Sequence, residues 1–299
     1  MRITLLLALL LVFNYSYAQK TDAERRQALK EIAKEAKIEN EARKKRVEAY
    51  IKDKGVAARF TTDEEQTVEI YDIRENGQPV YIATDNQGAA VTTGATSLNN
   101  GSAVGLNLNG EGVKIGVWDG GAVRTGHVEF DDDVTVSDGF STLNFHATHV
   151  TGTITANGVN SSARGMAPEA TLFTNHWDDD EAEMANLASS DQSGIILSNH
   201  SYGIPGGWVN GSWTGDPAVS SQEDWTFGFY DQSSRILDVI AYNAPYYLIA
   251  RSAGNERDDS GDGSFPPDGP YDNIGLAKVA KTVITVGAVY KIHGGSTNS

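Results

Sequence analysis

Two histidines lie three residues apart in the stretch NFHATHVTGTI, residues 144 to 154. His146 and His149 could bind a metal, pack in a core, or divide into one working base and one structural neighbour. A zinc pair is weakly supported, because the motif lacks the glutamate of H-E-x-x-H. The choice therefore depends on which other polar groups accompany the histidines.

Further polar residues follow short apolar runs of the chain. Asp119 ends KIGVWD and precedes Gly120-Gly121, while Asn255 follows YYLIARSAG. The carboxyl ends of parallel strands lie at one edge of a sheet, so these side chains could share a cleft. A buried carboxylate can hold an imidazole in one tautomer, the imidazole can deprotonate a nucleophile, and an amide can stabilise an oxyanion.

The segments that would position these groups alternate between strand-like and helix-like patterns, as in an α/β domain. VKIGVWD, ATLFTNH, IILSNHS, YYLIARSAGN and TVITVGAV are typical of buried parallel strands. The segments HATHVTGTITANG and SSRILDVIAYNA, which lie between them, have helical patterns. This alternation predicts a doubly wound α/β fold with a mostly parallel sheet.

Six ordered motifs resemble the subtilisin-like serine peptidases, the subtilases, over roughly residues 105 to 290. They are IGVWDGG, HATHVTGT, GMAPEATLF, SNHSYG, SAGNE and VITVGAV. The resemblance implies a subtilisin-like sheet with helices on both faces. It also implies that Asp119 is the triad aspartate, His146 the triad base and His149 a packed structural residue of the helix.

The resemblance implies three further sets of site residues. Asn255 matches the oxyanion-hole asparagine. Ser201, Tyr202 and Gly203 match the strand that pairs with an extended substrate, as an added strand would. Ser252, Ala253 and Gly254 match the wall of the pocket that holds the substrate residue before the scissile bond.

Three departures from the family pattern stand out. Gly120 replaces the usual Ser or Thr after the aspartate, and Ala147 replaces the usual Gly after the histidine. More seriously, the family's nucleophile lies in Gly-Thr-Ser, and neither that motif nor G-x-S-x-G occurs here; GGSTNS has the wrong order. We therefore expect a fragment with an incomplete catalytic domain, inactive by itself.

The resemblance thus implies a secreted serine endopeptidase precursor that hydrolyses peptide bonds in protein or peptide substrates, with no cofactor required for the chemistry. One alternative is a non-catalytic extracellular peptide-binding domain that keeps the cleft of a degenerate peptidase. A metallohydrolase that uses the histidines and acidic clusters is another.

The N-terminus predicts export. Arg2, the apolar run ITLLLALLLVF and the small residue Ala18 are typical of a signal peptide at residues 1–18. The apolar run is shorter than the roughly 20 residues that span a bilayer, so we expect no membrane association after cleavage. The expected location is extracellular, with the periplasm as an alternative.

Residues 19–95 have the features of a pro-region that binds within the same chain. A helix is expected at 21–54 and a hairpin at 66–83, around the turn Asn76-Gly77. The helix shows few apolar positions and little to bury. Residues 20 to 54 carry 12 basic and 8 acidic side chains, whereas residues 55 to 299 carry 11 and 32.

This charge contrast favours an intramolecular pro-region over a retained N-terminal module. The catalytic domain would be residues 96–299, and the mature start would lie between about residues 85 and 105. The acidic charge of this domain argues against nucleic acid as a partner, because phosphates require clustered Lys and Arg.

The acidic clusters 131–133, 178–181 and 258–262 are interpreted as solvated loops or as weak sites for structural calcium. The last is slightly favoured, with ligands Asp258, Asp259 and Asp262. The tryptophan-rich stretch 204–230 reads as a packed surface loop or, alternatively, as a lid over the cleft.

Overall fold

The computed structural model describes most of the chain. The described residues are 22–61, 67–84, 93, 95–99, 105–160, 163–190, 194–209, 211–255, 261–267 and 274–287. The predicted signal peptide lies outside them.

A six-stranded sheet forms the centre of the molecule, in the order β12-β11-β7-β4-β6-β5. All five pairings are parallel. The strands are β4 (Lys114–Asp119), β5 (Val134–Val136), β6 (Thr171–His176), β7 (Leu197–His200), β11 (Leu248–Ser252) and β12 (Val283–Val286). Each apolar run singled out in the sequence is a strand of this sheet, whereas the short β5 was not predicted.

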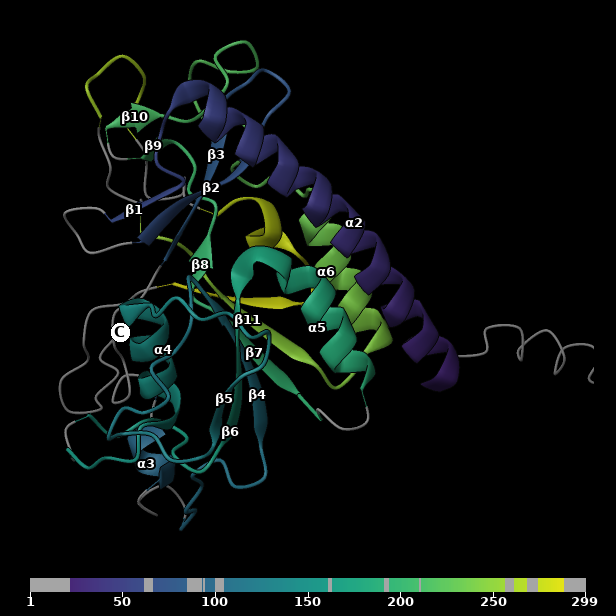
Figure 1. Cartoon of the computed structure of the whole chain (residues 1–299), viewed down its shortest axis with the longest axis vertical. Helices are drawn as coiled ribbons and strands as arrows, with labels where there is room; N and C mark the ends of the chain where they lie inside the picture. The colour runs from purple at the N-terminus through teal and green to yellow at the C-terminus, as the bar shows by residue number, and fades with distance from the viewer. Residues whose placement is uncertain are drawn as a thin grey trace, which may run out of the picture.

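Helices cover both faces of the sheet (Figure 1). On one side lies α4 (Phe145–Thr155), whose Val150 packs in a core with Val117 of β4. On the other side lie α5 (Asp180–Ser189) and α6 (Gln232–Asn243), whose core includes Trp118. Val117 and Trp118 point to opposite faces because side chains alternate along a strand. The predicted doubly wound α/β fold is confirmed.

Shorter elements complete the domain. They are α3 (Ala95–Asn99), η2 (Trp177–Asp179), η3 (Leu276–Val279), β8 (Tyr202–Gly203), β9 (Trp208–Val209) and β10 (Ser212–Trp213). Trp208 is buried, stacks edge-on against Trp213 and donates from Nε1 to Pro266 O at 2.8 Å. The structure therefore favours a packed loop over a lid for this stretch.

The N-terminal segment forms a long helix and an antiparallel sheet. These elements are α2 (Asp22–Lys54), β1 (Arg59–Thr61), β2 (Thr67–Ile73) and β3 (Pro79–Thr84). The turn between β2 and β3 contains Gly77 at φ 84°, a backbone conformation that favours glycine. None of the described helices is long and apolar enough to cross a bilayer.

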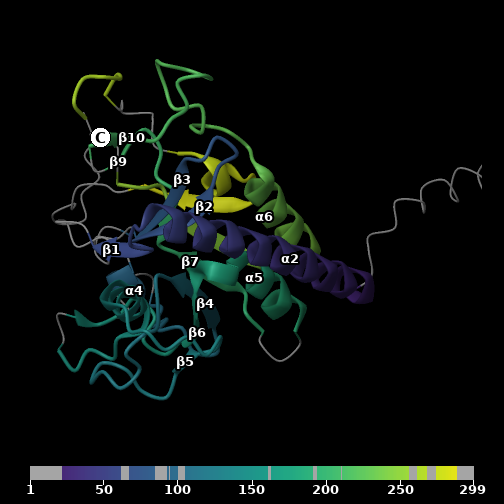
Figure 2. The ribbon, with the colours of Figure 1, turned by 45° about the horizontal axis from the view of Figure 1, so that its top comes forward.

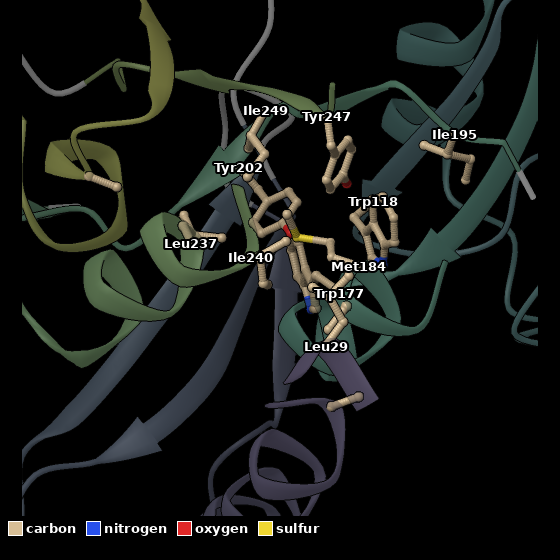
Figure 3. Close-up of a cluster of buried hydrophobic side chains, with 13 residues drawn as sticks. Leu29, Trp118, Trp177, Met184, Ile195, Tyr202, Leu237, Ile240, Tyr247 and Ile249 are labelled. Carbon is tan, nitrogen blue, oxygen red and sulfur yellow. The ribbon is translucent and has the colours of Figure 1, made fainter. Parts of the chain in front are cut away.

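The expectation that α2 has little to bury is wrong. Leu29 and Ala33 lie in the same core as Trp118, Trp177 and Met184 (Figure 3). Figure 2 shows α2 lying across α5 and α6. The buried positions are spaced by three and four residues and form one narrow stripe, which the polar Asn40 and Arg43 continue. Because two of its five positions are polar and two more are alanine, the stripe does not stand out as an apolar pattern in the sequence.

Candidate active site

Asp119 and His146 form a buried pair at the carboxyl edge of the sheet. The Nδ1 atom of His146 lies 2.9 and 3.0 Å from the two carboxylate oxygens of Asp119. Asp119 is only 1% exposed and His146 only 7% exposed. A carboxylate at this distance favours the tautomer with the proton on Nδ1, which leaves Nε2 as the basic atom.

The other ring nitrogen is placed as a base would need. Nε2 of His146 is buried and has no hydrogen-bond partner among the residues that the structure describes. Buried polar atoms normally have a partner, so an exception calls for an explanation. An imidazole that is oriented through Nδ1 and unoccupied at Nε2 can accept a proton from a nucleophile or an activated water.

The start of α4 holds this histidine in place. Asn144 is the N-cap, and its Oδ1 accepts a hydrogen bond from Ala147 N at 2.8 Å. The carboxylate of Asp119 is fixed at the end of β4, where Oδ1 also accepts from Gly120 N at 2.7 Å. Both members of the pair are therefore positioned by secondary-structure ends rather than by mobile loops.

Gly120, which departs from the family pattern, has little room for a side chain. A Cβ built on it would lie 3.1 Å from the indole of Trp177 and 3.4 Å from Nδ2 of Asn144. The first contact would require the Trp177 indole to move by a few tenths of an ångström, whereas the second is close to an ordinary van der Waals contact.

The expectation for His149 is wrong. Its side chain is exposed and lines a cavity of about 870 Å³ along the outer side of α4. The buried side of the helix carries His146, Ala147, Val150 and Thr151. The two histidines thus do not converge, and no cluster of three or more metal-binding side chains occurs in the part of the chain that the structure describes.

The predicted oxyanion-hole segment follows β11, with β7 between it and β4. Ala253 N donates to Val286 O at 2.8 Å, and Gly254 adopts φ 119°, so the chain turns sharply before the exposed Asn255. Since β4, β7 and β11 are parallel, Asn255 comes off the same edge as Asp119. Ser252 is half-buried and forms the end of β11.

The predicted substrate strand already has a partner. β8 pairs antiparallel with β3, with Ala83 opposite Gly203 and Thr84 opposite Tyr202. Ser201 precedes this strand, and its Oγ accepts from Asn199 Nδ2 at 2.9 Å. The edge that was expected to bind an extended substrate is therefore occupied by the last strand of the N-terminal hairpin.

The acidic cluster 178–181 is not a solvated loop, and sequence reasoning missed its role. Asp180 is buried at the start of α5, accepts from the Tyr202 hydroxyl at 2.7 Å and lies 3.7 Å from Arg251 Nη2. Burial, together with the neighbouring Asp180, raises the pKa of Glu181 to about 7. The available signal was Arg251, the one charged residue in the strand sequence LIARS.

The calcium prediction stays a prediction. Asp258 and Asp259 lie outside the described residues, and Asp262 is exposed and accepts from Ser264 N at 2.9 Å. A single carboxylate is a small part of the six to eight oxygens that calcium takes.

Comparisons of the sequence with known proteins found a family and one curated relative. The model of the subtilase family, Peptidase S8, matches residues 110–296. The major intracellular serine protease of Bacillus subtilis (strain 168) is 38% identical over 77 residues, which is 22% of this chain and 24% of that protein.

Similar solved structures are also proteases. The MycP3 protease of the type VII (ESX-3) secretion system has 19% identity and a TM-score of 0.41, over 70% of this chain and 62% of that one. The epidermin leader peptide processing protease EpiP of Staphylococcus aureus has 16% identity and a TM-score of 0.35, over 59% and 46%. The matched chain thus spans about a quarter of the curated relative and less than two thirds of either solved chain.

Proposed function

Since this chain belongs to the subtilase family, we propose that it is part of a secreted serine endopeptidase precursor that hydrolyses peptide bonds. The observation that carries the proposal is the buried Asp119–His146 pair at the carboxyl edge of the parallel sheet. The 299 residues contain no Gly-Thr-Ser, so we place the nucleophile serine in sequence that follows residue 299.

Each residue has a distinct role in this proposal. Asp119 keeps the proton of His146 on Nδ1 and stabilises the imidazolium that forms when Nε2 takes the serine proton. Asn255 donates to the oxyanion of the tetrahedral intermediate. The protein or peptide substrate lies along Ser201, Tyr202 and Gly203 as an added strand. No cofactor takes part in these steps.

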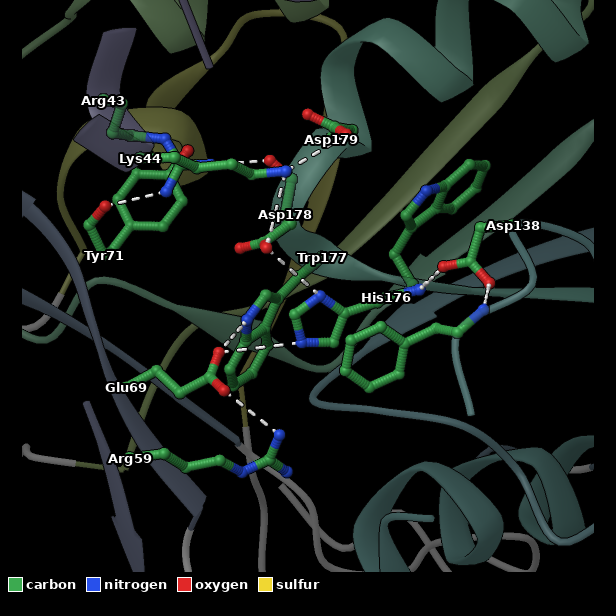
Figure 4. Close-up of polar contacts among 12 residues, drawn as sticks. Arg43, Lys44, Arg59, Glu69, Tyr71, Asp138, His176, Trp177, Asp178 and Asp179 are labelled. Atoms are coloured by element: carbon green, nitrogen blue, oxygen red, sulfur yellow. Dashed lines mark hydrogen bonds and ion pairs between the residues drawn. The ribbon is translucent and has the colours of Figure 1, made fainter. Parts of the chain in front are cut away.

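We propose further that residues 19–95 are a pro-region that blocks the substrate strand until it is removed. The pairing of β3 with β8 supports this role, because one edge cannot pair with two strands at once. The same segment is tied to the domain elsewhere: Arg43 donates to Asp178 O at 2.6 Å, and Lys44 lies 3.2 Å from Asp179 (Figure 4).

The pro-region also reaches the neighbourhood of the catalytic aspartate. Trp177 Nε1 donates to Glu69 of β2 at 2.6 Å, and the same indole lies against Gly120. His176, stacked on Phe140 at 4.0 Å, places Nε2 3.6 Å from Glu69 (Figure 4). N-terminal sequencing of the secreted protein tests the proposal, which expects a mature start between about residues 85 and 105. A start at Gln19 would show that the segment is retained.

The triad assignment is tested in the full-length gene product. His146→Ala should lower kcat by several orders of magnitude with the fold intact, and Asp119→Asn by about 10⁴-fold, as in other triad enzymes. His149→Ala is the matched control, because this histidine lies on the same helix but is exposed. Its kcat should be unchanged. Equal losses for both histidine variants, or full activity of His146→Ala, would refute the assignment.

A further inference from the structure

We propose that Lys278 makes the pocket for the residue before the scissile bond selective for an acidic side chain, so that the enzyme cleaves after Glu or Asp. This inference rests on the proposed peptidase function and assigns its substrate class. It starts from a lysine that is only 4% exposed although it lies in an ordinary-looking sequence, GLAKVAK.

Lys278 lies between the two segments that would enclose this substrate side chain. Its Nζ donates to Ala253 O at 3.0 Å, on the predicted pocket wall. A Cβ built on Gly203, in the predicted substrate strand, would collide with Cε of Lys278 and lie 2.8 Å from Nζ. The ammonium group thus bridges the pocket wall and the substrate strand.

The backbone of this lysine is held firmly. Thr285 Oγ1 of β12 donates to Lys278 O at 2.6 Å, and Ser234 Oγ of α6 donates to Leu276 O at 2.6 Å. Leu276 has φ 54°, an uncommon conformation for a residue with a side chain, which these contacts maintain. A charge attached to such a frame is preorganised for a ligand.

The surroundings of the ammonium also contain carboxylates, and these have contacts of their own. A small cavity of about 40 Å³ is lined by Lys278, Gly203 and Tyr202 and by three carboxylates, Asp180, Glu181 and Asp231, among others. Asp180 accepts from Tyr202 and lies beside Arg251, and Asp231 accepts from Ser234 N at the start of α6. The side chain of Glu181 is hydrogen-bonded to Ser233. Each of these carboxylates therefore has a hydrogen-bond or ion-pair partner other than Lys278.

Two consequences follow for the substrate. A carboxylate that enters beside Gly203 meets a full positive charge of low exposure, and a hydrogen bond to such a charge is stronger than a neutral one. The lysine stem also narrows the space beside Gly203, which disfavours a large aromatic side chain. The net negative charge of the domain opposes this preference weakly, because salt screens charges beyond about 8 Å.

The test uses the mature enzyme derived from the full-length protein. Peptides that differ only in the residue before the cleaved bond (Glu, Gln or Phe) are compared by kcat/KM. Glu should exceed Gln by at least tenfold, about the contribution of one charge-assisted hydrogen bond. In Lys278→Met this ratio should fall to about one and Phe should gain, whereas Lys278→Arg, which keeps the charge, should retain the preference.

Lys281→Met is the matched control, since the Lys281 side chain is 72% exposed and contacts Asp238. Its Glu-to-Gln ratio should equal that of the wild type. If Lys278→Met does not fold, the Glu-to-Gln ratio of kcat/KM in the wild type and in Lys278→Arg still tests the inference. Cleavage without preference for Glu would overturn the inference and leave the peptidase function standing.

A binding measurement separates the two claims. Product-like peptides that end in Glu or Gln, which have no bond left to cleave, are titrated calorimetrically into the mature protein. Tighter binding of the Glu peptide, lost in Lys278→Met, would support the acidic pocket independently of any cleavage rate. Equal binding of the two peptides would refute it.

Discussion

Truncation of Leu29 tests whether α2 is an integral part of the folded precursor. Leu29 is 1% exposed, although it lies in a helix of mostly charged residues. It packs in the core that contains Trp118, Trp177 and Met184, on the face of the sheet opposite α4. Leu29→Ala would leave a cavity among large side chains that cannot easily close around it.

Changes of this kind cost about 2 to 5 kcal/mol in other proteins, and we expect about 3 kcal/mol here because the site is fully buried. For a chain of this size, that corresponds to a fall in Tm of about 5 to 10 °C. The assay is urea and thermal unfolding of the full-length precursor in a His146→Ala background, which prevents self-processing.

Ile38→Ala is the control, because Ile38 belongs to the same helix but is 61% exposed. It should change the free energy of unfolding by about 0.5 kcal/mol or less. If both variants lose the same small amount, α2 does not pack in the core, and its role as a bound pro-region is wrong. If α2 is removed on maturation, as proposed, neither position can contribute to the stability of the mature protein.

The remaining predictions concern charge and space. Burial, partly offset by the Trp118 indole N–H at 2.8 Å, raises the pKa of Glu183 to about 7. The native state thus holds this proton more tightly than the unfolded chain, and stability falls as pH rises from about 4.5 to about 7, by up to about 3 kcal/mol. Denaturation of Glu183→Gln at pH 5 and pH 8 should show a smaller fall than the wild type. Glu69 should act in the opposite sense. Burial raises the pKa of this carboxyl, but contacts with His176, Arg59 and Trp177 outweigh burial, and the net shift is downward. Glu69 therefore stabilises the folded state above pH 4.5, and this stabilisation is lost as the pH falls through its folded pKa. Glu69→Gln should accordingly reduce the acid sensitivity of the precursor in the same denaturation assay. Gly120→Ser, which restores the usual family residue, should cost about 1 to 3 kcal/mol by crowding Trp177; unchanged Tm would contradict this.

Much of the catalytic domain could be predicted from the sequence. The strands β4, β6, β7, β11 and β12 are continuous apolar runs that end in polar residues, and such runs suit strands buried on both faces. Asp119 and His146 were predicted in the same way, from their positions next to these strands and helices. One ends a strand and the other begins a helix, so their types and their places along the chain both indicated a site.

Other features required the tertiary structure, because each depends on a neighbour distant in sequence. The stripe on α2 includes Asn40 and Arg43, and it becomes a buried face only beside α5, α6, β2 and η2. His149 obeys the helical period, but which side of α4 faces the sheet is set by packing. The pairing of β3 with β8 joins residues more than a hundred positions apart, and strand propensity carries no information about such a partner.

The charges show the same division most clearly. The sequence determined the number of acidic and basic side chains and the contrast between the N-terminal segment and the rest of the chain. It did not reveal that Asp180 and Arg251 meet in the interior, or that Lys278 lies beside Gly203 and Ala253. Whether a charged side chain is solvated or buried depends on the surfaces that fold around it, and only the tertiary structure decided which surfaces these are.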